Sequence, residues 1–96
     1  GSNQEINPGD INWMTAGRGI VHSERSPEAK LESGGPIHGI QLWVALPEEF
    51  EECDPSFSHH PKSTLPEFEI GGVELKLLLG QSFGKKSPVP LFSDLF

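Results

Sequence analysis

The chain has 96 residues, of which 34% are hydrophobic and 22% charged, so it is long enough for one small domain and too short for two. Fourteen acidic against seven basic residues give a formal net charge of −7, which disfavours direct binding to nucleic acid or to an anionic membrane. The single Cys53 excludes an intrachain disulfide, and no apolar run approaches the roughly 20 residues that span a bilayer. We therefore expect a cytoplasmic protein, with Gly1 and Ser2 as the remnant of a cleaved tag.

Turn-forming residues divide the first third of the chain into short elements. Residues 7–10, NPGD, have turn chemistry and lead into a predicted strand at residues 11–14. Residues 16–19, AGRG, interrupt this run, and residues 20–24, IVHSE, resume it as a second strand. Residues 26–32 open with Ser-Pro but are cut off by glycines after about two turns, so we expect a loop or a single helical turn there.

The middle of the chain holds the longest strand candidate, residues 37–46, IHGIQLWVAL, which Pro47 ends. Alternation places largely apolar side chains on both of its faces, which predicts a central strand. Residues 48–66 are rich in acids and prolines and predict a long surface loop. Eleven glycines and nine prolines between short β-type runs are typical of an all-β domain.

The last third of the chain predicts a hairpin and then an apolar tail. Residues 68–70 and 73–79 flank the pair Gly71-Gly72, as the strands of a β-hairpin do. The tail, residues 87–96, carries four large apolar side chains: Leu91, Phe92, Leu95 and Phe96. A domain rarely leaves such a run exposed, so we expect another surface to cover it.

The candidate site is the pair His22 and Glu24. On a strand, residues i and i+2 project from the same face with roughly 6.6 Å between their backbones, so both side chains could reach one ion. An imidazole and a carboxylate suit Fe(II), Mn or Zn. A half-exposed strand with polar residues outward would show the same pattern, so the pair alone leaves both interpretations open.

A family resemblance favours the metal. Residues 8–24, PGDINWMTAGRGIVHSE, resemble the most characteristic segment of the pirin family, and residues 39–47, GIQLWVALP, continue the similarity. The family often has Asn at the position of Ala45. Further matching positions are Gly72-Val73, Gly80, Phe83-Gly84 and Ser87-Pro88-Val89.

The resemblance implies a fold and a cofactor. Pirins are similar to two-domain cupins, so residues 1–96 are expected to form a single partial cupin domain, a jelly-roll-like β-barrel or sandwich, with the second pirin domain absent. The family's iron has four ligands: two His of an early His-x-His motif, then one His and one Glu. By that match His22 and Glu24 are the third and fourth ligands of Fe. No His-x-His occurs in the chain, so the expected site is incomplete.

Other histidines could supplement the pair. His59 and His60 could substitute for the missing ligands, although neighbours on an extended chain point opposite ways and solvent-exposed loop histidines are the ordinary interpretation. His38 could face the same interior as His22, or could be a hydrogen-bonded core histidine. A dimer could also bring His22 and Glu24 of two copies together.

Two functions remain from different classes. The resemblance implies an iron-dependent quercetin 2,3-dioxygenase, as described for several bacterial pirins. The alternative is a protein-interaction or self-associating module without independent catalysis, because pirins are also described as partners of other proteins. The incomplete ligand set favours the second, with a homodimer formed through the apolar tail and the strand around Trp43.

Overall fold

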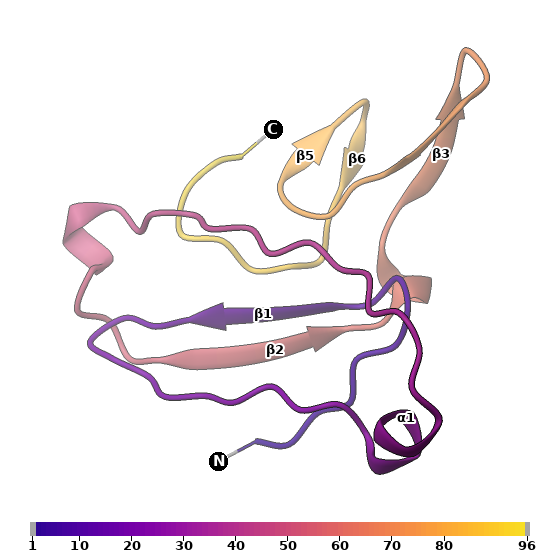
Figure 1. Cartoon of the computed structure of the whole chain (residues 1–96). Coiled ribbons are helices and arrows are strands. Elements are labelled where there is room, and N and C mark those ends of the chain that lie inside the picture. Colours follow the sequence, from indigo (N-terminus) through magenta and orange to yellow (C-terminus); the bar gives the residue numbers. More distant parts are fainter. Residues whose placement is uncertain (1, 96) are drawn as a thin grey trace.

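The computed structural model describes residues 2–95 and shows an all-β chain with little helix, as the sequence predicts (Figure 1). Its strands form three separate antiparallel pairs, consistent with part of a cupin β-fold. No helix among the described residues is long and apolar enough to cross a bilayer. The elements in chain order are β1 (Ile11–Thr15), α1 (Glu28–Ser33), the short 3-10 helix η1 (Glu48–Phe50), β2 (Ser56–His60), the short 3-10 helix η2 (Lys62–Thr64), β3 (Glu67–Ile70), β4 (Val73–Lys76), β5 (Gln81–Ser82) and β6 (Lys85–Lys86).

The pair β1–β2 is the longest in the fold and joins distant parts of the sequence. The predicted turn precedes it, with the Asp10 amide donating to the Asn7 carbonyl at 2.9 Å. Ile11 then lies opposite His60 and Thr15 opposite Ser56. The first strand is therefore confirmed.

The prediction of one long loop over residues 48–66 is wrong at β2. The sequence of β2, SFSHH, has no β-branched residue and lacks an alternating apolar pattern, so nothing local indicates a strand. Its strand conformation comes from the backbone ladder with β1, which no short stretch of sequence reveals.

A tight approach at Gly17 fixes the chain as it leaves β1. Gly17 has φ of +51°, the Arg18 amide donates to the Cys53 carbonyl at 3.0 Å, and the Arg18 guanidinium pairs with Asp54. A Cβ atom at Gly17 would collide with the Cys53 carbonyl oxygen. The predicted break after the first strand is thus a close backbone contact that requires glycine.

Gly17→Ala is expected to destabilise the fold by at least about 3 kcal/mol, because left-handed strain adds to the clash with Cys53. Gly71→Ala is the matched control, since Gly71 has a similar φ of +57° and open space around it. That variant should lose only about 1–2 kcal/mol. Urea unfolding of both variants measures the difference, and equal losses would show that the contact with Cys53 is unimportant.

The C-terminal half contains two hairpins and the small core. Strands β3 and β4 pair around Gly71-Gly72, which confirms the predicted hairpin, although β4 ends at Lys76 and the chain then leaves the ladder. Strands β5 and β6 form the second hairpin. Among the described residues the buried apolar side chains are Leu65 and Val89, each 5% exposed, so the core is very small.

The apolar tail folds back on its own chain. The rings of Phe92 and Phe50 have centroids 5.0 Å apart, and the Leu95 carbonyl accepts a hydrogen bond of 3.1 Å from the Gln81 amide. Leu91 and Leu95 are half-buried, whereas Phe92 stays 40% exposed. Phe96 lies outside the described residues. Part of the tail is therefore covered without a second copy.

Two predicted strands are absent from the described residues: 20–24 and 37–46 have no strand partner there. An extended chain becomes a strand only when a neighbour accepts its backbone hydrogen bonds, and none of the described strands lies against these segments. Between them the expected short helical element is confirmed as α1, which ends at Gly34 with φ of +67°.

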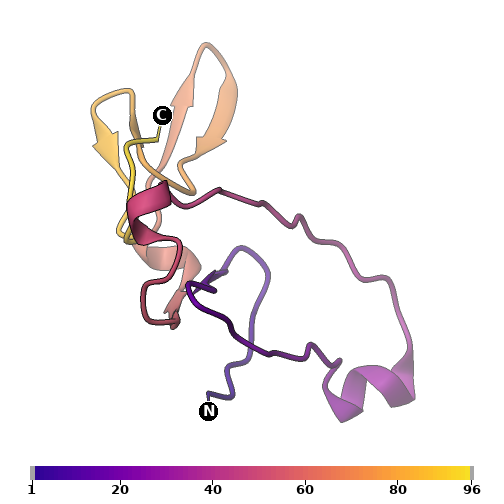
Figure 2. The ribbon, with the colours of Figure 1, turned by 90° about the vertical axis from the view of Figure 1, so that its left-hand side faces the viewer.

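Residues 20–46 stand away from the rest of the molecule as one long excursion (Figure 2). The radius of gyration is 15.5 Å, against about 12.5 Å for a compact domain of this length. The molecule is also thin, with principal extents of 43, 42 and 17 Å. The compact part is thus built from β1, β2 and the C-terminal hairpins, and this excursion contributes little to it.

Candidate functional site

The predicted metal ligands, His22 and Glu24, lie in the excursion between the Gly17 turn and α1. Both side chains are exposed, and neither takes part in a hydrogen bond or an ion pair with another described residue. Within residues 2–95, no group of three or more His, Cys, Asp or Glu side chains is placed to share a metal ion.

The ligand types of this pair therefore suit iron, but two ligands are too few to hold it. One imidazole and one carboxylate match the ligand types of non-haem iron sites, which use three protein groups. The described part of the chain adds no third donor. The assignment of His22 and Glu24 as ligands remains a prediction, and the residues present do not by themselves make a site that fits Fe.

The other histidines lie elsewhere in the fold. His38 is exposed in the excursion. His59 and His60 belong to β2 instead of the predicted loop, and both are half-buried. The His60 Nε2 atom lies 2.9 Å from Ser58 Oγ of the same strand, whereas His59 has its partner, Asn12, on β1.

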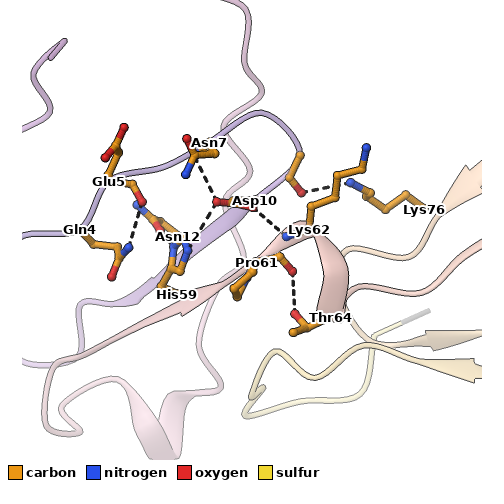
Figure 3. A network of polar contacts seen from close by, with 11 residues as sticks. Gln4, Glu5, Asn7, Asp10, Asn12, His59, Pro61, Lys62, Thr64 and Lys76 are labelled. Atoms are coloured by element: carbon orange, nitrogen blue, oxygen red, sulfur yellow. Dashed lines mark hydrogen bonds and ion pairs between the residues drawn. The ribbon is translucent and has the colours of Figure 1, made fainter.

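A network around Asp10 is the best-organised polar cluster of the molecule (Figure 3). The Asp10 Oδ1 atom accepts from the Lys62 amide at 2.7 Å, and its Oδ2 atom accepts from the Asn7 amide at 3.1 Å. The same Oδ2 atom lies 3.5 Å from His59 Nε2, and His59 Nδ1 lies 2.6 Å from Asn12 Oδ1. The imidazole is thus held between two side-chain oxygens of the neighbouring strand and turn.

A lysine ties this network to the first hairpin. The Lys76 ammonium donates to the Gly9 carbonyl at 3.1 Å and pairs with Glu67 at 3.2 Å. An open surface hollow lies beside it, lined by Asp10, Pro61, Lys62, Ser63, Leu65 and Glu67.

Sequence reasoning missed this cluster because its members are far apart along the chain. Only the NPGD turn gave a local signal, since an Asp at the end of such a turn commonly accepts from a nearby amide. Each Asp10 oxygen accepts one backbone hydrogen bond, which orients the carboxylate toward the chain that it holds. These hydrogen bonds hold the turn against β2 and η2, so the network has a structural role.

The network makes stability depend on pH in a defined direction. The Lys62 and Asn7 amides lower the pKa of the Asp10 carboxyl below its ordinary value of 3.8, with the nearby His59 acting in the same sense. A carboxyl whose pKa is lowered by folding stabilises the native state above its unfolded pKa. That stabilisation is lost as the pH falls through the folded pKa.

We therefore expect the unfolding midpoint to fall as the pH drops below about 4, and Asp10→Asn to flatten part of that fall. The variant should also unfold more easily at pH 6, because the amide replaces a charged acceptor with a neutral one. Thermal unfolding from pH 6 to pH 2.5 measures both effects, with Asp94→Asn as the exposed control. A pH dependence identical in wild type and Asp10→Asn would exclude this role for Asp10.

Comparison with known proteins places the chain in a family. The sequence model of the Pirin family matches residues 1–44. A pirin-like protein from Caulobacter vibrioides is 55% identical over 97 residues, which cover 100% of this chain and 33% of that protein. A Pseudomonas aeruginosa protein named "Putative quercetin 2,3-dioxygenase" is 43% identical over 99% of this chain and 28% of its own length. Human pirin is 36% identical over 93% of this chain and 29% of its own length.

The chain spans about a third of the length of these relatives. The matches to the Caulobacter vibrioides and Pseudomonas aeruginosa proteins cover 100% and 99% of this chain. The sequence predicted this resemblance from residues 8–24 and 39–47, and the matches confirm it. The chain belongs to the pirin family.

Proposed function

We propose that this chain acts by association, as a protein-interaction module that self-associates through its excursion. The observation that carries the proposal is the segment 37–46, which is extended, largely apolar, exposed at residues 37–45 and without a backbone partner among the described residues. No hydrogen bond between described residues involves the backbone of residues 37–46.

The exposure of this segment is unusual for its composition. Ile37 is 88% exposed, Ile40 81% and Trp43 89%, although large aliphatic and aromatic side chains are normally covered. Contiguous apolar surface of this kind marks interaction sites on soluble proteins, and an unpaired extended backbone is a template for strand addition. Both properties of the segment favour pairing with another β-strand.

Equilibrium sedimentation tests the proposal. Across a range from about 1 to 300 µM, chosen because pairing through one strand is weak, we expect the apparent mass to rise from 10.5 kDa toward twice that value. Removal of residues 91–96 tests whether the tail contributes to the association. We expect the association to persist without the tail, because residues 37–46 remain. A single species near 10.5 kDa at every concentration would contradict it.

A second candidate function is an iron-dependent quercetin 2,3-dioxygenase. The specific observation in its favour is the Pseudomonas aeruginosa relative of that name, which matches this chain almost from end to end. Such an activity would require a metal cofactor, with His22 and Glu24 as two of its ligands. Oxygen consumption in the presence of quercetin and Fe(II) tests it, and turnover that Glu24→Gln abolishes would establish it.

A further inference from the structure

We infer that His59 makes a pH-sensitive contact between the turn of residues 7–10 and strand β2, because protonation of its imidazole strengthens its hold on Asp10 and Asn12. The contact lies in the compact part of the chain. It is separate from the proposed association and from the predicted metal ligands, which lie in the excursion. What changes with pH is how firmly the turn is held against β2 and η2.

The imidazole of His59 lies between two oxygen atoms of the opposite strand and its turn (Figure 3). Asn12 is the register partner of His59 in the β1–β2 pair, so the two side chains project from the same face. The His59 Nδ1 atom lies 2.6 Å from Asn12 Oδ1, a hydrogen-bond distance, and Nε2 lies 3.5 Å from Asp10 Oδ2, an ion-pair distance. The side chains of His59 and Asp10 are 18% and 9% exposed, so water screens their interaction only in part.

The number of protons on the ring decides how well it fits this position. A neutral imidazole carries one N–H, so it donates to one of the two oxygens, and its other nitrogen directs a lone pair at the second oxygen. The imidazolium donates from both nitrogens and adds an attraction to the Asp10 carboxylate. Rotation of the Asn12 amide would let its NH2 group meet a neutral ring, but it would not replace the lost attraction to the carboxylate.

The Asp10 carboxyl stays charged throughout the pH range in which histidines titrate, roughly pH 5 to 8. The backbone amides of Lys62 and Asn7 donate to its two oxygens and lower the pKa of the Asp10 carboxyl below its ordinary value of 3.8. In this range the imidazole is therefore the group of the contact that changes charge. The stabilisation is present at the acidic end of the range and is lost as the pH rises through it.

Other titratable side chains surround the contact from the segment before the turn and from β2, η2, β3 and β4: Glu5, His60, Lys62, Glu67 and Lys76. The two lysines lie on the side of the turn away from His59, so Asp10 is the nearer charge (Figure 3). Lys76 is in addition paired with Glu67 at 3.2 Å. The positive charges therefore oppose protonation of the ring less than Asp10 favours it.

Urea unfolding at pH 5.5 and pH 8 tests the inference on the 96-residue chain, with Asp10→Asn, His59→Gln and the double variant. Glutamine keeps the ability to hydrogen bond but does not titrate. The coupling of the two residues is the factor by which one substitution changes the effect of the other on the unfolding constant. We expect this factor to be about threefold larger at pH 5.5 than at pH 8, in line with ion pairs of limited exposure.

The matched control replaces His59→Gln by His60→Gln in the same set of variants. His60 is the neighbouring histidine of β2, but its Nε2 atom lies 2.9 Å from Ser58 Oγ and its ring is not part of the contact with Asp10. Its coupling to Asp10 should be the same at both pH values. Equal coupling of His59 and Asp10 at the two pH values, or an equal pH dependence with His60, would overturn the inference.

Amide hydrogen exchange decides the matter if a variant does not fold. The Lys62 amide donates to Asp10 Oδ1 at 2.7 Å, so its protection in the wild-type chain reports how firmly the turn is held. The reference is the Leu77 amide, which donates to the Pro66 carbonyl at 2.9 Å. After correction for intrinsic rates, protection of Lys62 relative to Leu77 should fall about threefold from pH 5.5 to pH 8. A constant ratio would overturn the inference.

Discussion

Trp43→Asp is expected to make the chain monomeric at every concentration where the wild type associates. The indole is 89% exposed in the single copy and belongs to the segment through which we propose that two copies associate. Each dimer would lose the contacts of two indoles and gain two buried negative charges. At about 2 kcal/mol or more for each lost aromatic contact, the dissociation constant should rise on the order of 1,000-fold.

Val21→Asp is the matched control for this variant. Val21 is 96% exposed in the same excursion but lies outside residues 37–46, so it adds the same charge without touching the proposed interface. Sedimentation of the two variants beside the wild type separates a local effect from general charge repulsion. Equal weakening by both substitutions, or an undisturbed Trp43→Asp dimer, would argue against the segment as the interface.

The second large effect concerns iron. Because the described residues supply one imidazole and one carboxylate and no third donor, the 96-residue chain is expected to retain fewer than roughly one iron per ten molecules after purification without chelators. Elemental analysis after incubation with Fe(II) and gel filtration in an iron-free, oxygen-free buffer measures this. Near-stoichiometric iron would show that other residues, or a second copy, complete the ligand set.

Variants decide where any bound metal lies. If iron is retained, His22→Ala and Glu24→Gln should each remove it, because each deletes one of the predicted ligands. His38→Ala and His59→Ala are the comparison set, since His38 and the pair His59-His60 were the alternatives. Unchanged iron in His22→Ala with loss in either comparison variant would move the site away from the predicted pair.

Local signals in the sequence predicted the local parts of the fold. The NPGD turn, the strand after it and the hairpin at Gly71-Gly72 each depend on residues close together in the chain, and all three are confirmed. Strand pairing across long separations behaved differently. Residues 37–46 have a strong β pattern but no neighbour among the described residues, while β2 has a weak pattern and gains its neighbour from β1.

The same contrast between neighbouring and distant residues applies to the candidate sites. The pair His22 and Glu24 is visible in the sequence because its two members are two residues apart, and only the family resemblance gave it a role. The Asp10 network joins residues separated by about half the chain, so no spacing rule could reveal it. What the sequence lacks in both cases is the position of distant segments relative to one another.

The excursion between the Gly17 turn and η1 places little constraint from folding stability on its residues. The entropy of closing such a loop grows only with the logarithm of its length, so that a doubling of length costs about 0.6 kcal/mol. The β1–β2 pair would therefore tolerate large changes in the length of residues 20–46. Yet His22, Glu24 and residues 39–46, which carry much of the family resemblance, lie in this segment. Most of these side chains are exposed, so a mutational survey scored by thermal stability alone would pass over them.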